Sequence, residues 1–172
     1  TDQPWGGDVV YLAASDFTTP LTLFALDLNV MELTVMRRQP QQFVSDGIEV
    51  RQFWAVSSDG ERIPYFHVGK NAAPDTPTLV YAYGGFGVPE LPHYLGSIGK
   101  YWLEEGNAFV LANIRGGGEF GPRWHQAAQG ISKHKSVDDL LAVVRDLSER
   151  GMSSPEHIGL QGGSNGGLIT AA

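Results

Sequence analysis

The sequence predicts an α/β fold, because short apolar strands alternate with amphipathic helices along most of the chain. Residues 78–83 and 108–113 are apolar runs of the kind that is buried on both faces of a parallel sheet. A third run, residues 158–161, leads directly into a glycine-rich turn at residues 162–167. A helical pattern precedes each of the last two strands, as expected when helices connect parallel strands.

The N-terminal part of the chain has strand patterning without helical patterning. Residues 9–12 are a short apolar run, residues 21–28 largely alternate between apolar and polar side chains, and residues 37–42 form a polar connection. Two strands alone are marginally stable in water, so this part must pack against another part of the protein. We expect this part to be the tail of another domain, because the pattern changes from Ile48 onward.

The second part begins with an antiparallel hairpin. Residues 50–56 and 62–68 have the pattern of strands, and the Asp59-Gly60 pair between them is a strong hairpin signal. The first helix is expected over residues 95–103, where apolar side chains keep helical spacing. Gly106 is placed to end it.

A longer helix is predicted before the last strand. Its apolar stripe is formed by Val137, Leu140, Leu141, Val144 and Leu147. Ser136 is the expected N-cap and Gly151 lies just past the end. Asp138 and Asp139 fall in the first turn, where the helix dipole favours carboxylates.

Composition and charge exclude several classes of function. The net charge of −7 argues against non-specific nucleic-acid binding, which needs a basic face. The chain has no cysteine, so disulfides and thiolate metal sites are excluded. No apolar stretch approaches the roughly 20 residues that a membrane-spanning helix needs. We therefore expect no nucleic-acid or membrane partner, and a cytoplasmic location with the periplasm as the alternative.

The strongest functional signal is the turn in which Gly162-x-Ser164-x-Gly166 fits a nucleophile elbow. Such a turn lifts a serine hydroxyl above a parallel sheet, and its strained backbone leaves room only for glycine at the flanking positions. A glycine-rich turn that happens to carry a serine is the alternative, but the preceding strand and the following apolar residues favour the elbow. Asn165 would place its backbone N–H beside an oxyanion, at the N-terminus of a helix.

A second glycine-rich segment, residues 116–121, follows a strand and satisfies G-x-G-x-x-G, the pattern of a dinucleotide site. The acidic residue that such a site requires about 20 residues later should end a parallel strand. At that distance Asp138 and Asp139 begin a helix instead, and Pro122 follows the last glycine directly. The sequence therefore disfavours a dinucleotide site, and the absence of Gly-Lys-Ser or Gly-Lys-Thr excludes a P-loop.

All five histidines precede Ser164 in the chain. None forms His-Glu-x-x-His and no pair has a recognisable metal spacing, so no metal site is expected. His125, beside Trp124, is the histidine expected in a structured loop near the site. A hydrolase with this elbow takes its acid and then its histidine from positions after the serine, so none of the five can complete the triad.

Residues 83–86, Tyr-Gly-Gly-Phe, end the strand 78–83 where the second oxyanion donor of an α/β-hydrolase usually lies. An aromatic turn that packs against the core is the alternative. A tyrosine O–H can donate the hydrogen bond that a backbone amide otherwise supplies, so both interpretations are physically sound.

Three segments together resemble the prolyl oligopeptidase family of serine peptidases. They are residues 81–86 (Tyr-Ala-Tyr-Gly-Gly-Phe), residues 112–121 (Ala-Asn-Ile-Arg-Gly-Gly-Gly-Glu-Phe-Gly) with Trp124-His125, and residues 162–167. Their order and spacing match, and the resemblance extends from about Phe53 to the end. The run Asn-Ile-Arg-Gly-Gly-Gly-Glu is more similar to prolyl endopeptidases than to the oligopeptidase B branch.

The resemblance implies a β-propeller that caps an α/β-hydrolase domain and admits only short peptides. Residues 1–45 would be the last propeller strands and the crossover, and residues 46–172 the N-terminal part of the hydrolase domain. The family's nucleophile corresponds to Ser164. Its oxyanion hole corresponds to the Tyr83 hydroxyl and the Asn165 amide, and Phe86 matches a residue of the substrate pocket. The implied reaction is cleavage of short peptides after proline through an acyl-enzyme, without a cofactor.

Two alternatives remain open. A related acyl hydrolase, such as an acylaminoacyl-peptidase, an oligopeptidase B-like enzyme or an esterase, could use the same elbow. Alternatively, we expect that the chain is truncated just after the elbow, because the triad aspartate and histidine are absent from it. The isolated 172-residue chain would then be inactive and would need the C-terminal half of the same enzyme as its partner.

Overall fold

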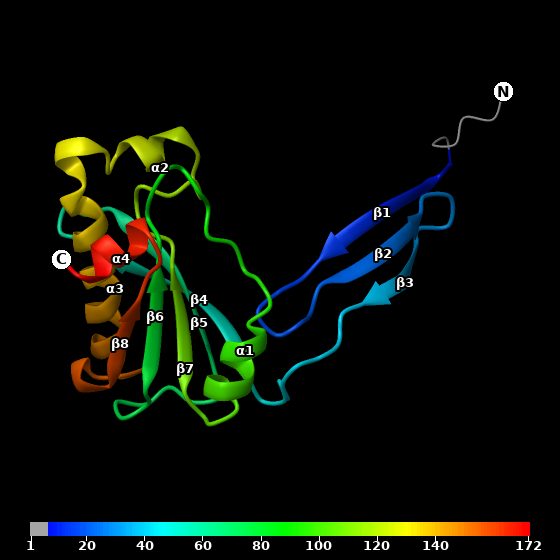
Figure 1. The fold of residues 1–172 in the computed structure, drawn as a ribbon, viewed down its shortest axis with the longest axis horizontal. Coiled ribbons are helices and arrows are strands. Elements are labelled where there is room, and N and C mark those ends of the chain that lie inside the picture. The colour runs from blue at the N-terminus through cyan, green and yellow to red at the C-terminus, as the bar shows by residue number, and fades with distance from the viewer. Residues whose placement is uncertain (1–6) are drawn as a thin grey trace.

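The computed structural model describes residues 7–172, which form two separate sheets. An antiparallel sheet contains β1 (Val9–Ala14), β2 (Thr22–Asp27) and β3 (Glu32–Arg38) in that order. A mixed sheet has the strand order β4-β5-β7-β6-β8, with the bounds β4 (Glu49–Val56), β5 (Arg62–Gly69), β6 (Thr78–Ala82), β7 (Ala108–Ala112) and β8 (Ile158–Gln161). The first sheet projects away from the body that contains the second (Figure 1).

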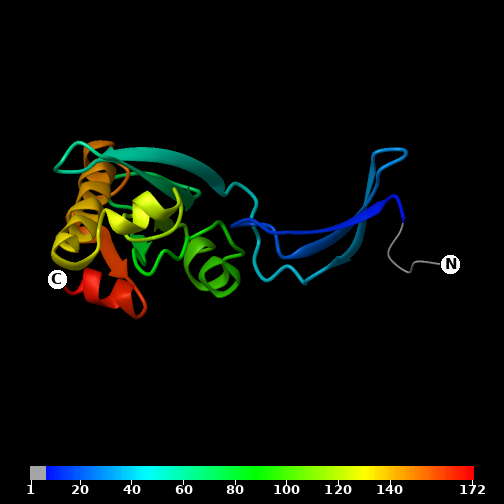
Figure 2. The same ribbon diagram turned by 90° about the horizontal axis from the view of Figure 1, so that it is seen from above.

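Within residues 7–172, four α-helices accompany the mixed sheet. They are α1 (Gly96–Ile98), which continues into a π-helical turn (Gly99–Leu103), α2 (Pro122–Gln126), α3 (His134–Glu149) and α4 (Asn165–Thr170). Short 3₁₀ turns lie at Gly130–Ser132 and Pro155–His157. Figure 2 shows α1 and α3 on opposite sides of the mixed sheet. The α/β fold predicted from the sequence is confirmed.

The parallel part of the mixed sheet sets the position of the site. β6 lies between β7 and β8 and runs parallel to both, so that Val80 is paired with Val110 on one side and Leu160 on the other. The carboxyl ends of β6 and β8 therefore meet at one edge of the sheet, where ligands of open α/β sheets bind. The loops that start at Tyr83 and Gly162 leave the sheet at this edge.

Two apolar cores cover the two faces of the mixed sheet. On one face, Leu140, Val143 and Leu147 of α3 pack against buried residues of the strands, with Ile169 of α4 in the same cluster. On the other face the core consists of Phe17, Phe43, Val68, Leu95, Leu103, Phe109 and Leu111. This arrangement explains why β7, which lies in the middle of the sheet, is apolar and buried throughout.

Two aromatic residues from the segments around the antiparallel sheet belong to the second core. Phe17 follows β1, and its backbone oxygen accepts a hydrogen bond from the Leu95 N–H at 3.1 Å. The ring of Phe43 stacks on Tyr94 with their centroids 5.3 Å apart, and it lies where a Cβ on Gly99 would stand. The antiparallel sheet is thus anchored to the body at two places, by Phe17 in the connection between β1 and β2 and by Phe43 in the segment after β3.

Two details of the predicted secondary structure were wrong. The polar connection expected over residues 37–42 overlaps a third strand, β3, which pairs with β2. Its side chains are exposed, so backbone pairing rather than burial holds it, although Leu33 and Val35 do alternate with the polar Glu32 and Thr34. Secondly, α3 begins at His134, so Ser136 is no N-cap and Asp138 and Asp139 lie beyond the first turn. Its hydroxyl instead donates to the Arg115 carbonyl at 2.7 Å.

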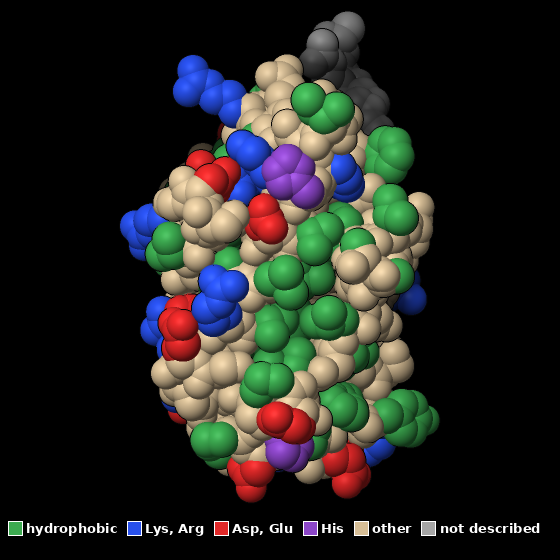
Figure 3. Space-filling model, turned by 90° about the vertical axis from the view of Figure 1, so that its left-hand side faces the viewer, with side chains coloured by type: hydrophobic (Ala, Val, Ile, Leu, Met, Phe, Trp, Pro, Cys, Tyr) green, Lys and Arg blue, Asp and Glu red, His purple; other side chains and the backbone are tan. Residues whose placement is uncertain are grey.

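One side of the molecule carries a band of exposed apolar side chains (Figure 3). The apolar residues that are exposed on α3, β8 and α4 are Leu141, Leu160 and Leu168. Within residues 7–172, β8 pairs only with β6 and leaves its other edge open. In the same range, no helix is long and apolar enough to cross a membrane.

We expect the stability of the fold to depend on the protonation of His67, which is buried in β5. Burial, with a smaller contribution from the charge of Arg51, lowers the pKa of His67 from 6.5 to about 4. The unfolded chain therefore binds a proton that the folded chain does not bind between these pH values. The free energy of unfolding should fall by up to about 1.4 kcal/mol per unit as the pH drops through this window.

Denaturant-induced unfolding at pH 7, 6, 5 and 4 measures this dependence. The variant His67→Gln should lose the part of the slope that lies between pH 6.5 and 4, whereas the exposed His157→Gln should keep it. Equal slopes in the wild type and in His67→Gln would show that His67 is not the titrating group.

Candidate active site

Ser164 lies in the turn between β8 and α4, with its backbone in a strained conformation. Its φ of +50° and ψ of −116° lie outside the regions that side-chain-bearing residues normally adopt. The residue is exposed, and it immediately precedes Asn165, the first residue of α4. The first backbone N–H groups of a helix have no partner inside the helix, and the N–H of Asn165 is the first in α4.

The predicted need for glycine on both sides of Ser164 is confirmed. A Cβ on Gly162 would lie within 3.0 Å of three backbone atoms of Gly166. A Cβ on Gly166 would come as close to the backbone oxygen of Ala82, at the end of β6. The turn is therefore tight because its two glycines touch each other and the neighbouring strand.

This contact predicts a large difference between two neighbouring substitutions. Gly166→Ala should lower the free energy of unfolding by about 1–3 kcal/mol, because the new methyl group would collide with backbone. Gly163→Ala is the matched control, because nothing lies within 4 Å of its Cβ position. That variant should stay within about 0.5 kcal/mol of the wild type in denaturant-induced unfolding. Similar losses in both variants would contradict the geometry of the turn.

The loop that follows β6 lies directly against this turn. The side-chain amide of Asn165 donates to the backbone oxygen of Tyr83 at 2.6 Å. Gly85 faces the same side chain so closely that a Cβ there would collide with it. Phe86 has a φ of +55° and is 75% exposed, so an aromatic ring is held in solvent by a strained backbone. The structure thus places Asn165, which directly follows Ser164, against the loop that carries Tyr83 and Phe86.

The glycine-rich segment after β7 supports this loop from the other side. The Gly87 N–H donates to the backbone oxygen of Gly116 at 3.1 Å. Cβ atoms on Gly116 and Gly118 would collide with the backbone oxygens of Gly84 and Gly87. The glycines at positions 116 and 118 therefore allow close contact between two loops.

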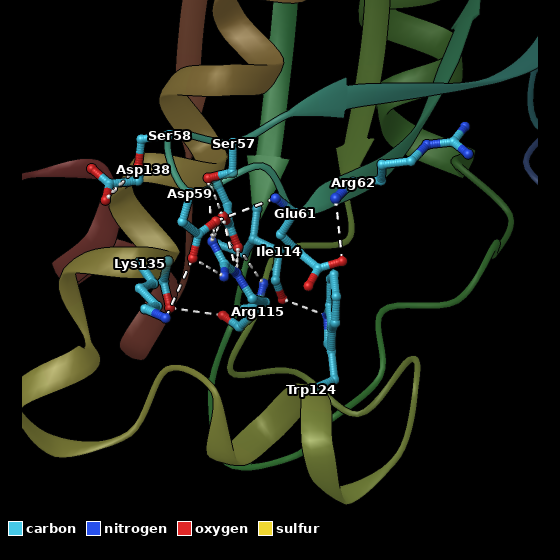
Figure 4. Close-up of polar contacts among 12 residues, drawn as sticks. Ser57, Ser58, Asp59, Glu61, Arg62, Ile114, Arg115, Trp124, Lys135 and Asp138 are labelled. Carbon is cyan, nitrogen blue, oxygen red and sulfur yellow. Dashed lines mark hydrogen bonds and ion pairs between the residues drawn. The ribbon is translucent and has the colours of Figure 1, made fainter.

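A buried ionic network holds this segment in place (Figure 4). The guanidinium of Arg115, which is 3% exposed, donates to the fully buried carboxylate of Asp139 and, at 2.6 Å, to Asp59. Ser57 donates its hydroxyl to Asp139 at 2.6 Å. The network thereby joins the β4–β5 hairpin, the segment after β7 and α3. Hydrogen bonds from Arg115 hold the pKa of the Asp59 carboxyl well below its usual range.

A second set of contacts fixes the far end of the Phe86 loop. Glu119 accepts the backbone N–H of Glu90 at 3.0 Å, and the Asn113 side-chain amide donates to the Glu90 carbonyl at 2.7 Å. Sequence reasoning missed Arg115, Asn113 and Glu119 as supporting residues. The sequence did contain a hint of these roles, because charged and amide side chains interrupt the glycine-rich residues 112–121.

A cavity of about 250 Å³ opens next to Asn165, the residue after Ser164, between the Phe86 loop and the segment before α3. Its lining is formed by Gly85, Phe86, Gly116, His125, Ala128, Gln129, Gly130, Lys133 and Asn165. His125 lies in this structured loop, as predicted, and its Nδ1 donates to the Gly116 carbonyl at 2.9 Å. Its Nε2 accepts the side-chain amide of Gln129, so both ring nitrogens are engaged within the loop.

The arrangement supplies a serine hydroxyl and nearby hydrogen-bond donors, but no proton acceptor for the hydroxyl. Among residues 7–172, neither a histidine nor a carboxylate is hydrogen-bonded to Ser164. In the same part of the chain, no three His, Asp or Glu side chains are grouped as metal ligands. A base from another segment is therefore required before Ser164 can act as a nucleophile.

Comparison with known proteins agrees with this site. The family model of the prolyl oligopeptidase family matches residues 95–172. An uncharacterized peptidase of Sinorhizobium fredii is 42% identical over 94% of this chain and 23% of its own length. A prolyl endopeptidase of Elizabethkingia meningoseptica is 31% identical over 95% of this chain and 23% of its own length.

A solved structure shows the same fold. The post-proline cleaving enzyme of Rickettsia typhi superimposes with a TM-score of 0.86 and 38% sequence identity, over 95% of this chain and 24% of that enzyme. The chain thus spans about a quarter of the length of the relatives that it matches. On these matches, and with the nucleophile elbow in the expected place, the chain belongs to the prolyl oligopeptidase family.

Proposed function

We propose that this chain forms the nucleophile and oxyanion-hole part of a serine peptidase that cleaves short peptides after proline. The observation that carries the proposal is the strained, exposed Ser164, which adjoins the contact between the Asn165 side chain and the Tyr83 backbone. Two relatives named for cleavage after proline, a prolyl endopeptidase and a post-proline cleaving enzyme, support the substrate class.

In the proposed reaction, Ser164 Oγ attacks the carbonyl carbon of the proline residue while a base takes its proton. The negative charge on the tetrahedral intermediate accepts hydrogen bonds from the Tyr83 hydroxyl and the Asn165 backbone N–H. Collapse of the intermediate breaks the peptide bond, and the leaving amine takes the proton from the base. The acyl ester on Ser164 is then hydrolysed by water in the reverse sequence, which regenerates the hydroxyl.

The proposed base and its acid are a histidine and an aspartate that lie outside these 172 residues. The chemistry requires them, because the described residues offer Ser164 no proton acceptor. We further propose that residues 46–172 are the N-terminal part of an α/β-hydrolase domain and that residues 1–45 are the last strands of a β-propeller with the crossover. The separation of the two sheets supports this division.

Hydrolysis by the full-length protein of three otherwise identical peptides, with proline, arginine or an acylated alanine before the cleaved bond, tests the substrate class. The proposal expects the highest kcat/KM for the proline peptide. A higher value for the arginine or the acylated peptide would favour a related oligopeptidase or an acylaminoacyl-peptidase instead. Hydrolysis of a simple ester, with no cleavage of any of the three peptides, would favour an esterase.

The role of Tyr83 is tested by Tyr83→Phe, which removes one hydroxyl and keeps the ring. We expect kcat to fall by about 10²–10³-fold with little change in KM, because an oxyanion-hole donor acts in the transition state. Tyr101→Phe, on an exposed tyrosine of the π-helical turn, is the matched control and should leave both constants unchanged. A rise in KM at constant kcat would assign Tyr83 to substrate binding.

A further inference from the structure

The cavity lined by Lys133 and Asn165 differs in charge from the molecule as a whole. The chain carries 19 acidic and 12 basic residues, yet the lining of this cavity contains Lys133 and no carboxylate. The side-chain amides of Gln129 and Asn165 also line it, and one N–H of each already donates to His125 and to the Tyr83 backbone oxygen. A cavity that presents a cation and amide donors without an acidic side chain has the chemistry of an anion site.

Lys133 is half-buried, and its Nζ donates to the backbone oxygen of Gly84 at 2.5 Å. An ammonium group has three N–H donors, so this contact leaves two for other partners. Within residues 7–172, Lys133 forms no ion pair, although Lys135, two positions later, pairs with Asp59. Burial also lowers the pKa of Lys133.

The position of the cavity decides what kind of anion can reach it. Phe86 and Asn165 line it, and Asn165 directly follows the serine that we propose as the nucleophile. His125 donates a hydrogen bond to the Gly116 carbonyl and accepts one from the Gln129 side-chain amide. These two bonds fix the part of the cavity wall that His125 forms. A molecule bound at Ser164 could therefore place a group in this cavity, on the side of Asn165.

We propose that this cavity is a subsite for a carboxylate of the bound peptide, and that the Lys133 ammonium group holds it. The carboxylate can come from an aspartate or glutamate side chain or from a free C-terminus close to the cleaved bond. The proposal rests on the proposed function only in assigning the carboxylate to a peptide. An anion at Lys133 would supply the missing counter-charge in a partly desolvated position, where such contacts are strongest.

Four proline-containing pentapeptides distinguish the two sources of the carboxylate. They differ only in glutamate or glutamine beside the proline, and in a free or an amidated C-terminus. Their Kd values are measured by isothermal titration calorimetry on the full-length protein with Ser164→Ala, so that no hydrolysis occurs. We expect one of the two acidic features to tighten binding about ten-fold over its neutral counterpart.

Three variants in the same background show whether Lys133 is the cause. Lys133→Met should bring the ratio of the acidic to the neutral Kd close to one, and Lys133→Arg should retain the preference. Lys100→Met, which removes the same charge from an exposed position, should leave the ratio unchanged. Equal Kd values for acidic and neutral peptides in the wild-type cavity would overturn the proposal without any variant. An acidic preference that survives in Lys133→Met would overturn it as well.

The outcome also separates this subsite from the proposed peptidase function. Tighter binding of the acidic peptides, without hydrolysis by the unaltered protein, would support the proposed subsite and contradict the proposed peptidase function. Hydrolysis after proline with no acidic preference would do the reverse. If Lys133→Met weakened the binding of all four peptides equally, Lys133 would only hold the Gly84 backbone in place, and the proposed subsite would be overturned.

Discussion

Ser164→Ala in the full-length protein is expected to lower kcat for a proline peptide by about 10⁴–10⁶-fold, with little change in substrate binding. The reason is that the variant removes the only atom that can form the acyl ester, while the turn around it keeps its shape. Residual hydrolysis should persist above the uncatalysed rate, because the oxyanion donors remain. Steady-state kinetics with one chromogenic proline peptide measures the effect.

The matched control for this variant lies at a serine outside the elbow. Ser97→Ala removes a hydroxyl from an exposed position in α1 and should leave kcat and KM unchanged. Circular dichroism of Ser164→Ala should equal that of the wild type, so that a lost fold is distinguished from a lost nucleophile. A decrease of less than ten-fold would show that another group performs the attack.

Arg115→Met should lower the free energy of unfolding by about 3–5 kcal/mol. Asp139 is fully buried and receives several hydrogen bonds from Arg115, so removal of the guanidinium leaves a buried carboxylate without its cation. The same change should release the segment that supports Gly84 and Gly87. Denaturant-induced unfolding measures the first effect, and hydrogen exchange of the amide of Gly87 measures the second.

Arg51→Met is the control for this prediction, because Arg51 forms an ion pair with Glu49 in which both side chains are exposed. Exposed pairs of this kind contribute roughly 0–1 kcal/mol, so its loss should be small. Arg115→Lys keeps the charge without the forked geometry and should fall between the two. If Arg115→Met were no more destabilising than Arg51→Met, the network would not be a structural support.

The features that sequence reasoning predicted depend on neighbouring residues. The strands 78–83, 108–113 and 158–161 were recognised because a buried parallel strand is apolar throughout, and the structure has β6, β7 and β8 in these places. The elbow was recognised because its tight backbone demands glycine at fixed spacing. The positive φ of Ser164 and the collisions expected at Gly162 and Gly166 follow from the same constraint.

The features that were missed depend on contacts between distant segments. Arg115 meets Asp59 and Asp139, which lie 56 and 24 positions away, and no local pattern reveals that pairing. The start of α3 was misplaced for the same reason, because the Ser136 hydroxyl is used by the Arg115 carbonyl and not as a cap. The cavity at Lys133 likewise arises only when the loops after β6 and β7 come together.

The most direct test of the proposed nucleophile is to locate the covalent bond. The full-length protein is treated with a proline-based diphenyl phosphonate, digested and analysed by tandem mass spectrometry. We expect one phosphonate adduct, on the side-chain oxygen of Ser164, and none in Ser164→Ala. An adduct on a different residue, or complete inhibition without an adduct at Ser164, would contradict the assignment of this serine as the nucleophile.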